Sequence, residues 1–220
     1  MFFTLFKKEL FIEFRTKEVV LSMLIFGLSI ILAFAFSSNV SKVIVANYAP
    51  GMFWVMILFV TTLGVHRSFS YEKEFDAFSL LVGSPIDRGM IYLAKWLSGS
   101  IFLTIMEAII VIPFFKFLLI ELPSNFLLFS MTSILINLAI MSVAILVAGI
   151  AMRASLSEVL VPILFFPLVS PVIIAATKIT SGILSNDPYQ LWQIWLLIVV
   201  SVIVIFVLAG YTLFDFITEE

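Results

Sequence analysis

Cysteine is absent from this 220-residue chain, and histidine occurs only once. The first absence excludes disulfides, zinc–thiolate sites and thiol nucleophiles, and the second excludes a metal site built on two histidines. Charged residues make up only 12% of the chain, and no basic cluster is long enough to neutralise a nucleic-acid backbone. No GxxxxGKS, GxxxxGKT, GxSxG or HExxH motif occurs. We therefore expect no nucleic-acid partner, no metal site, and no ATP binding through a phosphate loop of the chain's own.

Apolar residues, by contrast, are abundant: they make up 63% of the chain, which includes 24 Phe. A soluble domain of this composition would expose large apolar patches, whereas lipid solvates the same surface. Because helices satisfy their own backbone polar groups, about 20 apolar residues in a helix cross the bilayer core. We expect an all-α polytopic membrane protein, one transmembrane domain over residues 1–220, with six spans at about Val19–Ser37, Pro50–His66, Trp96–Phe117, Phe126–Ile150, Val159–Thr177 and Leu191–Phe214.

The Lys and Arg residues outside the spans are unevenly distributed. Nine lie in the N-terminal segment, in residues 67–95 and in the 151–158 loop, and only Lys42, Lys116 and Lys178 lie on the other side. Since basic residues accumulate in cytoplasmic loops, this bias predicts that both termini and the 67–95 segment are cytoplasmic.

Residues 1–18 repeat large apolar side chains at helical spacing: Phe3, Phe6, Leu10 and Phe14. This pattern predicts an amphipathic helix that lies in the membrane interface with its Phe side in the acyl boundary. The alternative is a docking surface for a partner subunit.

Residues 67–95 interrupt the apolar chain with eight of its 26 charged residues. Phe75, Phe78, Leu81 and Val82 share a helical face, and the sequence Gly83-Ser84-Pro85 then breaks the helix. We expect a short helix along the cytoplasmic surface that a soluble motor domain could grip. An inert interfacial loop is the alternative, although 29 residues is long for one.

Glu107 and Asn137 fall at the midplane of the third and fourth spans, each eleven residues in. An ionisable group at that depth is costly and suggests a function. A protonated Glu107 hydrogen-bonded to Asn137 would clamp the two helices; the other readings are a substrate contact and an intramembrane enzyme built on Glu107. The fifth span carries Pro162, Pro167 and Pro171, which predict either a bent packing helix or a hinge.

Three stretches, in order, resemble the CcmB family, the B subunit of the haem exporter in cytochrome c maturation. The first opens the second span as Ala49-Pro50-Gly51-Met52-Phe53-Trp54; the second runs from Arg67-x-Phe69 through Leu81 and Pro85 to Leu93-Ala94-Lys95; the third is Phe166-Pro167-Leu168-Val169-Ser170-Pro171. In the cytoplasmic helix, Asp76 stands where the family pattern has Gly, and Ser79 stands where it has Glu.

The resemblance implies a permease subunit of an ABC transporter in the bacterial inner membrane, and not an enzyme. Two copies would pair with two copies of an ATPase, which binds ATP, and further partners would be a haem-handling membrane protein and a periplasmic haem chaperone. Haem is then a possible substrate of the complex, with no cofactor bound directly by this chain. The ATPase contact would involve Glu72, Phe75, Asp76, Phe78, Ser79, Leu81, Pro85 and Arg88. The alternative function is an ABC-2-type exporter of a lipid, glycan or drug.

Overall fold

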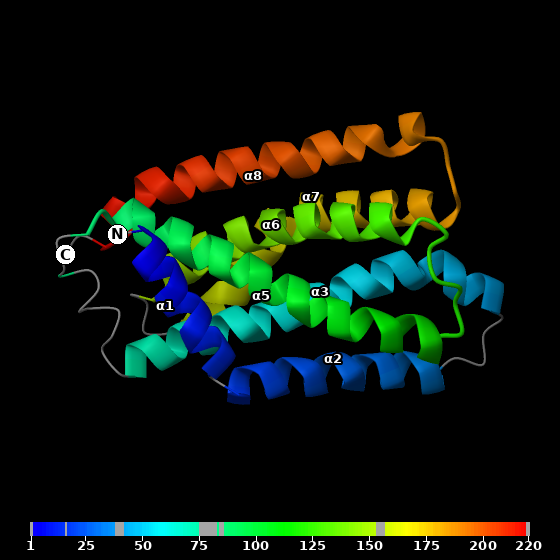
Figure 1. Cartoon of the computed structure of the whole chain (residues 1–220), viewed down its shortest axis with the longest axis horizontal. Helices are drawn as coiled ribbons and strands as arrows, with labels where there is room; N and C mark the ends of the chain where they lie inside the picture. Colours follow the sequence, from blue (N-terminus) through cyan, green and yellow to red (C-terminus); the bar gives the residue numbers. More distant parts are fainter. Residues whose placement is uncertain are drawn as a thin grey trace.

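The computed structural model of the chain describes residues 2–15, 17–37, 42–74, 83, 86–152 and 157–218. Within these ranges the regular structure consists of seven helices and no strand (Figure 1). All but the first helix are long and apolar enough to cross a membrane, which confirms the predicted all-α class and the six spans. The helices are α1 (Phe2–Arg15), α2 (Lys17–Ser37), α3 (Lys42–Glu74), α5 (Arg88–Phe117), α6 (Phe126–Ala151), α7 (Ser157–Leu184) and α8 (Tyr189–Thr218).

Helix α6 forms the centre of the bundle, where it packs against α3, α5, α7 and α8. Its membrane-length segment is 78% buried, against 17% for that of α8. The sequence explains this position, because residues 139–149 are apolar or small on every side and all of them are buried. A helix that is hydrophobic all round belongs in a core, and α6 is accordingly enclosed by its neighbours.

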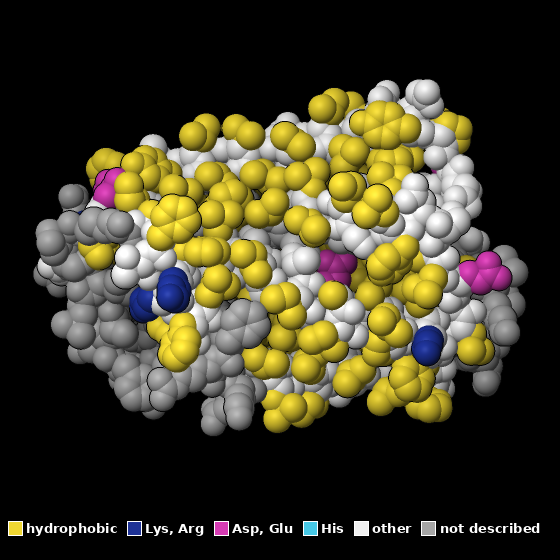
Figure 2. Space-filling view, viewed as in Figure 1, with side chains coloured by type: hydrophobic (Ala, Val, Ile, Leu, Met, Phe, Trp, Pro, Cys, Tyr) yellow, Lys and Arg dark blue, Asp and Glu magenta, His cyan; other side chains and the backbone are white. Residues whose placement is uncertain are grey.

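Large apolar side chains cover the outer faces of the peripheral helices, and Figure 2 shows one such face of the molecule. Exposed examples are Leu21, Ile25 and Leu32 on α2 and Leu197, Val204 and Leu208 on α8. Contiguous apolar surface of this extent is unfavourable in water and favourable against lipid tails. The outer faces therefore fit a multi-pass membrane protein.

Three span boundaries differ from the prediction. Helix α3 begins at Lys42, so Pro50 lies inside it and does not open the span. Proline does not end a helix where tertiary packing compensates for the lost hydrogen bond, and Pro50 is buried. Helix α5 begins at Arg88 because Asp87 caps it, and α7 continues past Thr177 to Leu184.

Helix α7 is continuous through all three of its prolines. Pro171 has no N–H to offer the carbonyl of Pro167, one turn earlier. The Ser170 hydroxyl instead donates to that carbonyl at 2.8 Å. A local side chain thus replaces the missing backbone donor at one of the three positions.

The two chain termini lie at the same end of the bundle, together with the end of α3 and the start of α5 (Figure 1). We call this the termini end. Helix α1 crosses the bundle here and packs against α5 and, to a smaller extent, α2. A helix at the predicted position of residues 1–18 is therefore present, while its placement in a membrane interface stays a prediction.

Candidate functional site

The segment predicted to meet a motor domain joins α3 to α5 at the termini end. Helix α3 continues through Glu72 to Glu74, and α5 begins at Arg88. The other predicted contact residues, Phe75, Asp76, Phe78, Ser79, Leu81 and Pro85, lie outside the described residues. The short surface helix thus stays a prediction, and the part of the site that the structure describes is the attachment of its two ends.

The start of α5 is fastened to the last turns of α8. Asp87 caps α5 by accepting a hydrogen bond from the Gly89 backbone N–H at 2.9 Å, and its second carboxylate oxygen accepts one from the Tyr211 hydroxyl at 2.9 Å. Arg88 donates from Nη1 to the Asp215 carbonyl oxygen at 3.1 Å. The C-terminal part of the predicted motor-contact segment, including the predicted contact residue Arg88, is therefore tied to the C-terminal helix.

Two glycines let α5 and α8 approach this closely. A Cβ at residue 89 would lie 2.6 Å from the Tyr211 ring and 2.8 Å from the Tyr211 carbonyl oxygen. A Cβ at residue 210 would lie 2.1 Å from the ring of Tyr92. Real Cβ atoms do not come so close, so each glycine is required by the contact it permits.

Tyr92 connects three helices one turn further along α5. Its ring is fully buried, and its hydroxyl contacts the carbonyl oxygens of Ser142 on α6, at 2.9 Å, and Phe206 on α8, at 3.0 Å. A buried tyrosine hydroxyl needs such a partner to offset its desolvation. The first turns of α5 are thus held to the core helix as well as to α8.

Lys95 forms a second junction, between α1, α3 and α5. Its ammonium donates to Glu9 Oε2 of α1 at 3.0 Å and lies 5.0 Å from the ring centroid of Phe69 on α3. Lys95 is 3% exposed and Glu9 is 4% exposed, so both charges are removed from solvent. Charges buried this deeply are tolerated only when they are paired.

Glu9 also accepts a hydrogen bond from Lys8 at 2.9 Å. Burial works against the charged form of this carboxylate, but the ammonium groups of Lys95 and Lys8 outweigh it and lower the pKa of Glu9 below its ordinary value. The pair is therefore ionised at neutral pH, and it attaches α1 to the bundle electrostatically as well as through the buried side chain of Leu5.

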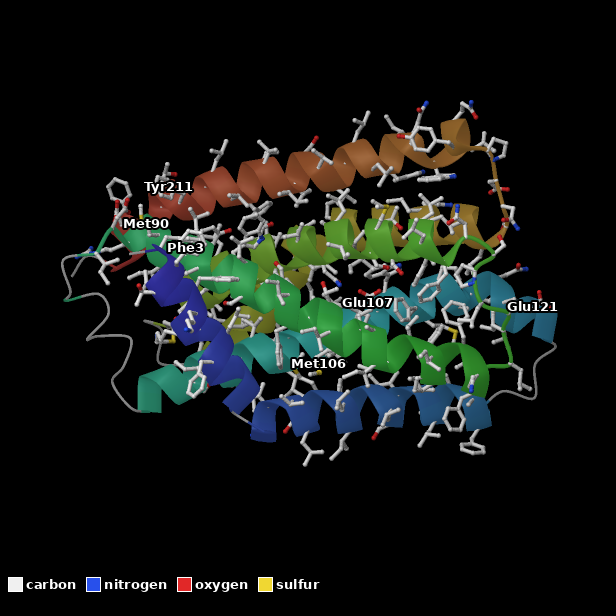
Figure 3. All side chains as sticks on the ribbon, in the orientation of Figure 1. Phe3, Met90, Met106, Glu107, Glu121 and Tyr211 are labelled. Atoms are coloured by element: carbon white, nitrogen blue, oxygen red, sulfur yellow. The ribbon has the colours of Figure 1, made fainter. Side chains whose placement is uncertain are left out.

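In the middle of the bundle, where Figure 3 labels Glu107 of α5, the amide of Asn137 on α6 donates to Glu107 Oε2, as the sequence predicted. The same amide lies 3.3 Å from the Thr104 hydroxyl oxygen. Both Glu107 and Asn137 are buried. The contact joins α5 to the central helix far from either end of the bundle.

The first family-motif stretch packs against α7 and α5. Trp54, fully buried, donates its indole N–H to the Thr180 hydroxyl of α7 at 2.8 Å, and its neighbour Phe53 packs edge-on against Phe114 of α5. A Cβ added at Gly51 would lie 3.8 Å from the Thr177 methyl, an ordinary contact distance. Ala49 and Pro50 are buried, so this stretch lies at a helix–helix contact, whereas Pro167 and Pro171 of the third stretch are exposed on α7.

Sequence reasoning missed Glu9, Tyr92 and Tyr211. Glu9 is separated from Lys95 by 86 positions, and nothing local marks it as a partner. In the structure Glu9 falls one turn after Leu5 and both side chains are buried, whereas Phe3 on the predicted Phe side is 80% exposed. No group of three or more His, Cys, Asp or Glu side chains that could hold a metal ion occurs among the residues that the structure describes.

Residues 1–213 match the profile of the family described as CcmB protein. A search of curated proteins finds no match.

Proposed function

The chain belongs to the CcmB family, and from this premise we propose that it is the permease subunit of an ABC transporter acting in cytochrome c maturation. It would couple ATP hydrolysis by a separate ATPase subunit to haem export or to release of the haem-loaded periplasmic chaperone. Six membrane-length helices support the permease role. The lack of a phosphate-binding loop in the sequence supports an ATPase on another subunit.

In this proposal the ATPase contacts the 67–95 segment. The contact residues are Glu72, Phe75, Asp76, Phe78, Ser79, Leu81, Pro85 and Arg88. One observation carries this assignment: α5 is fastened to α8 at Asp87 and Arg88 and to α1 at Lys95. A displacement of the segment would therefore move the first turns of α5 together with α1 and α8, because hydrogen bonds of 2.9 to 3.1 Å join these helices and the Lys95–Glu9 pair is buried. Rigid-body movement of packed helices is how small displacements cross a membrane domain.

The assembly we propose contains two copies of this chain and two of the ATPase, with a haem-handling membrane protein and a periplasmic haem chaperone as further partners. The whole chain would form one permease domain of the bacterial inner membrane, with both termini and the termini end of the bundle in the cytoplasm. Helix α1 would lie at the membrane surface, with its exposed Phe3 and Phe11 in the acyl boundary and Glu9 facing the bundle.

Deletion of the gene tests the function. A deletion strain should lose holo-cytochrome c, detected by haem staining, and regain it when the wild-type gene is supplied, while b-type cytochromes are unchanged and serve as the control for haem synthesis. Normal holo-cytochrome c in the deletion strain would contradict the proposal and favour an exporter of a lipid, glycan or drug.

A further inference from the structure

Four polar side chains meet in the middle of the bundle, on the facing sides of α5 and α6. Figure 3 labels Glu107 at mid-length between the two helices, and an acidic patch lies there in the apolar face of Figure 2. Asn137 donates to Glu107 Oε2 and contacts Thr104, whose own hydroxyl donates to the Ser100 carbonyl. Ser133, one helical turn before Asn137, faces the same carboxyl without reaching hydrogen-bond geometry.

Three buried oxygens of this cluster have no hydrogen-bond partner: Glu107 Oε1, Asn137 Oδ1 and Ser133 Oγ. The three residues are at most 4% exposed, so water from bulk solvent does not reach them. Their neighbours behave differently, since Ser100 and Thr132 both donate to the carbonyl one turn back. Buried polar atoms are rarely left without a hydrogen-bond partner, so the cluster lacks a proton that two of these oxygens could share in a hydrogen bond.

Among the side chains that the structure describes, none with a positive charge supplies the missing partner. Along α5 the nearest lysines are Lys116, about 14 Å away at 1.5 Å per residue, and Lys95, about 18 Å away and already paired with Glu9. Helix α6 has no ionisable residue, and α2 has none among its described side chains. Of the ionisable side chains of α3 near α5, His66 and Arg67 lie at the termini end; on α8, Tyr211 and Asp215 lie at that end and Tyr189 lies at the opposite end. An ionised carboxylate here would be buried without a counter-charge, at a high cost in free energy.

We propose that Glu107 is a proton-binding site, with a neutral carboxyl whose Oε1–H donates to Asn137 Oδ1. Acid and amide then form a two-point pair, because Asn137 Nδ2 already donates to Glu107 Oε2. The proton comes from hydronium of the solvent: one O–H bond of hydronium breaks and leaves water, and the new Oε1–H bond converts the carboxylate to the acid. The two orphaned oxygens of the pair become each other's partners, and the Ser133 hydroxyl is left free to donate to the carboxyl.

The proton is a better occupant than a small cation. A cation would be bound through oxygens, yet Asn137 turns its N–H toward the carboxyl and thereby occupies one carboxyl oxygen with a donor. A neutral acid–amide pair also leaves no net charge between α5 and the central helix. The inference is independent of the transport role, since it concerns only the protonation state of one side chain.

Infrared difference spectroscopy on the full-length protein in lipid nanodiscs tests this directly. We expect the wild-type minus Glu107→Gln spectrum at neutral pH, in Na⁺-free buffer, to contain the C=O stretching band of a protonated carboxyl, shifted in D₂O. A carboxylate band in its place, or a carboxylate band that appears only on addition of Na⁺, would overturn the proposal.

Asn137→Leu provides a second measurement if Glu107→Gln does not accumulate. It removes the acceptor of the proton, so the C=O band should remain but move to higher frequency, whereas an unchanged band would overturn the two-point pair. Thermal unfolding supplies a matched comparison: Glu107→Gln keeps a neutral pair and should melt near the wild-type temperature, and Glu107→Leu should melt lower. Equal losses in the two variants would contradict a neutral carboxyl.

Discussion

At the scale of single residues, Lys95 connects three helices, α1, α3 and α5, through one charge. It is an ammonium group placed in an otherwise apolar stretch of α5, where it touches a carboxylate of α1 and an aromatic ring of α3. A buried charge of this kind is not a source of large net stability, but removing its partner leaves a costly unpaired charge. The junction therefore makes the position of α1 depend on that of α5.

Lys95→Met should destabilise the protein by about 3–5 kcal/mol, because Glu9 would keep its charge in a buried site with only the partly exposed Lys8 nearby. The measurement is unfolding in mild detergent. Lys8→Met is the matched control and should cost less than about 1 kcal/mol, since Lys8 is a third exposed. A second substitution, Glu9→Leu, should restore most of the loss. Equal losses of stability in Lys95→Met and Lys8→Met would contradict a stabilising role for the buried Lys95–Glu9 pair.

The junction also predicts how stability depends on pH. The pKa of Glu9 is lowered in the folded protein, so its contribution is present above the unfolded-state value, near 4.5, and is lost as the pH falls through the lower folded-state value. Wild type should therefore be more stable than Glu9→Gln at neutral pH, and melting curves should converge in acid below pH 4.5. A difference that stays constant across this range would rule out an ionised Glu9 as its cause.

Among the elements, the first turns of α5 are attached to two other helices. Asp87, Arg88 and Tyr92 tie them to α8 and α6, and Gly89 and Gly210 permit the close packing. These contacts lie in the C-terminal part of the segment that we assign to the ATPase. The α5–α8 contact is accordingly the place where a force on that segment would enter the membrane domain.

Gly89→Ala should separate α5 from α8, because its Cβ meets the Tyr211 backbone as well as the ring. We expect a loss of about 1–3 kcal/mol in thermal or chemical unfolding, as for other overpacked sites. Gly51→Ala is the matched control: its nearest neighbour is 3.8 Å away, so it should be neutral or gain up to about 1 kcal/mol in helix propensity. Similar behaviour of the two alanine variants would show that the close contact at residue 89 is dispensable.

At the scale of the whole molecule, the arrangement of charges predicts its orientation in the membrane. The chain has no cysteine, so a single introduced one reports one position. Lys7 and Glu121 are both exposed and lie at opposite ends of the bundle. An impermeant maleimide added outside spheroplasts should label Glu121→Cys and spare Lys7→Cys until the membrane is opened. Labelling of Lys7→Cys but not of Glu121→Cys in intact spheroplasts would show that the orientation is opposite to the predicted one.

Much of this architecture could be predicted because hydrophobicity over 20 residues is a strong and local signal. Glu107 and Asn137 could also be paired in advance, since two polar residues at equal depth in adjacent helices have few other partners. The predicted start of the second span at Pro50 was wrong, because a proline commonly lies in the first turn of a helix. Only the tertiary packing around Pro50 shows that α3 begins earlier, at Lys42. The Glu9–Lys95 pair could not be predicted, because it depends on how α1 folds back across the bundle.

An ATPase bound to the segment between α3 and α5 would lie within reach of a short crosslinker attached to that segment. Single cysteines at positions 72, 76 and 79, in a complex copurified in mild detergent, can be treated with a short bifunctional crosslinker, with Glu121→Cys as the control at the opposite end. We expect a crosslink to the ATPase from at least one of the three positions and none from position 121. No crosslink from any of the three positions in an intact complex would show that the ATPase does not contact this segment.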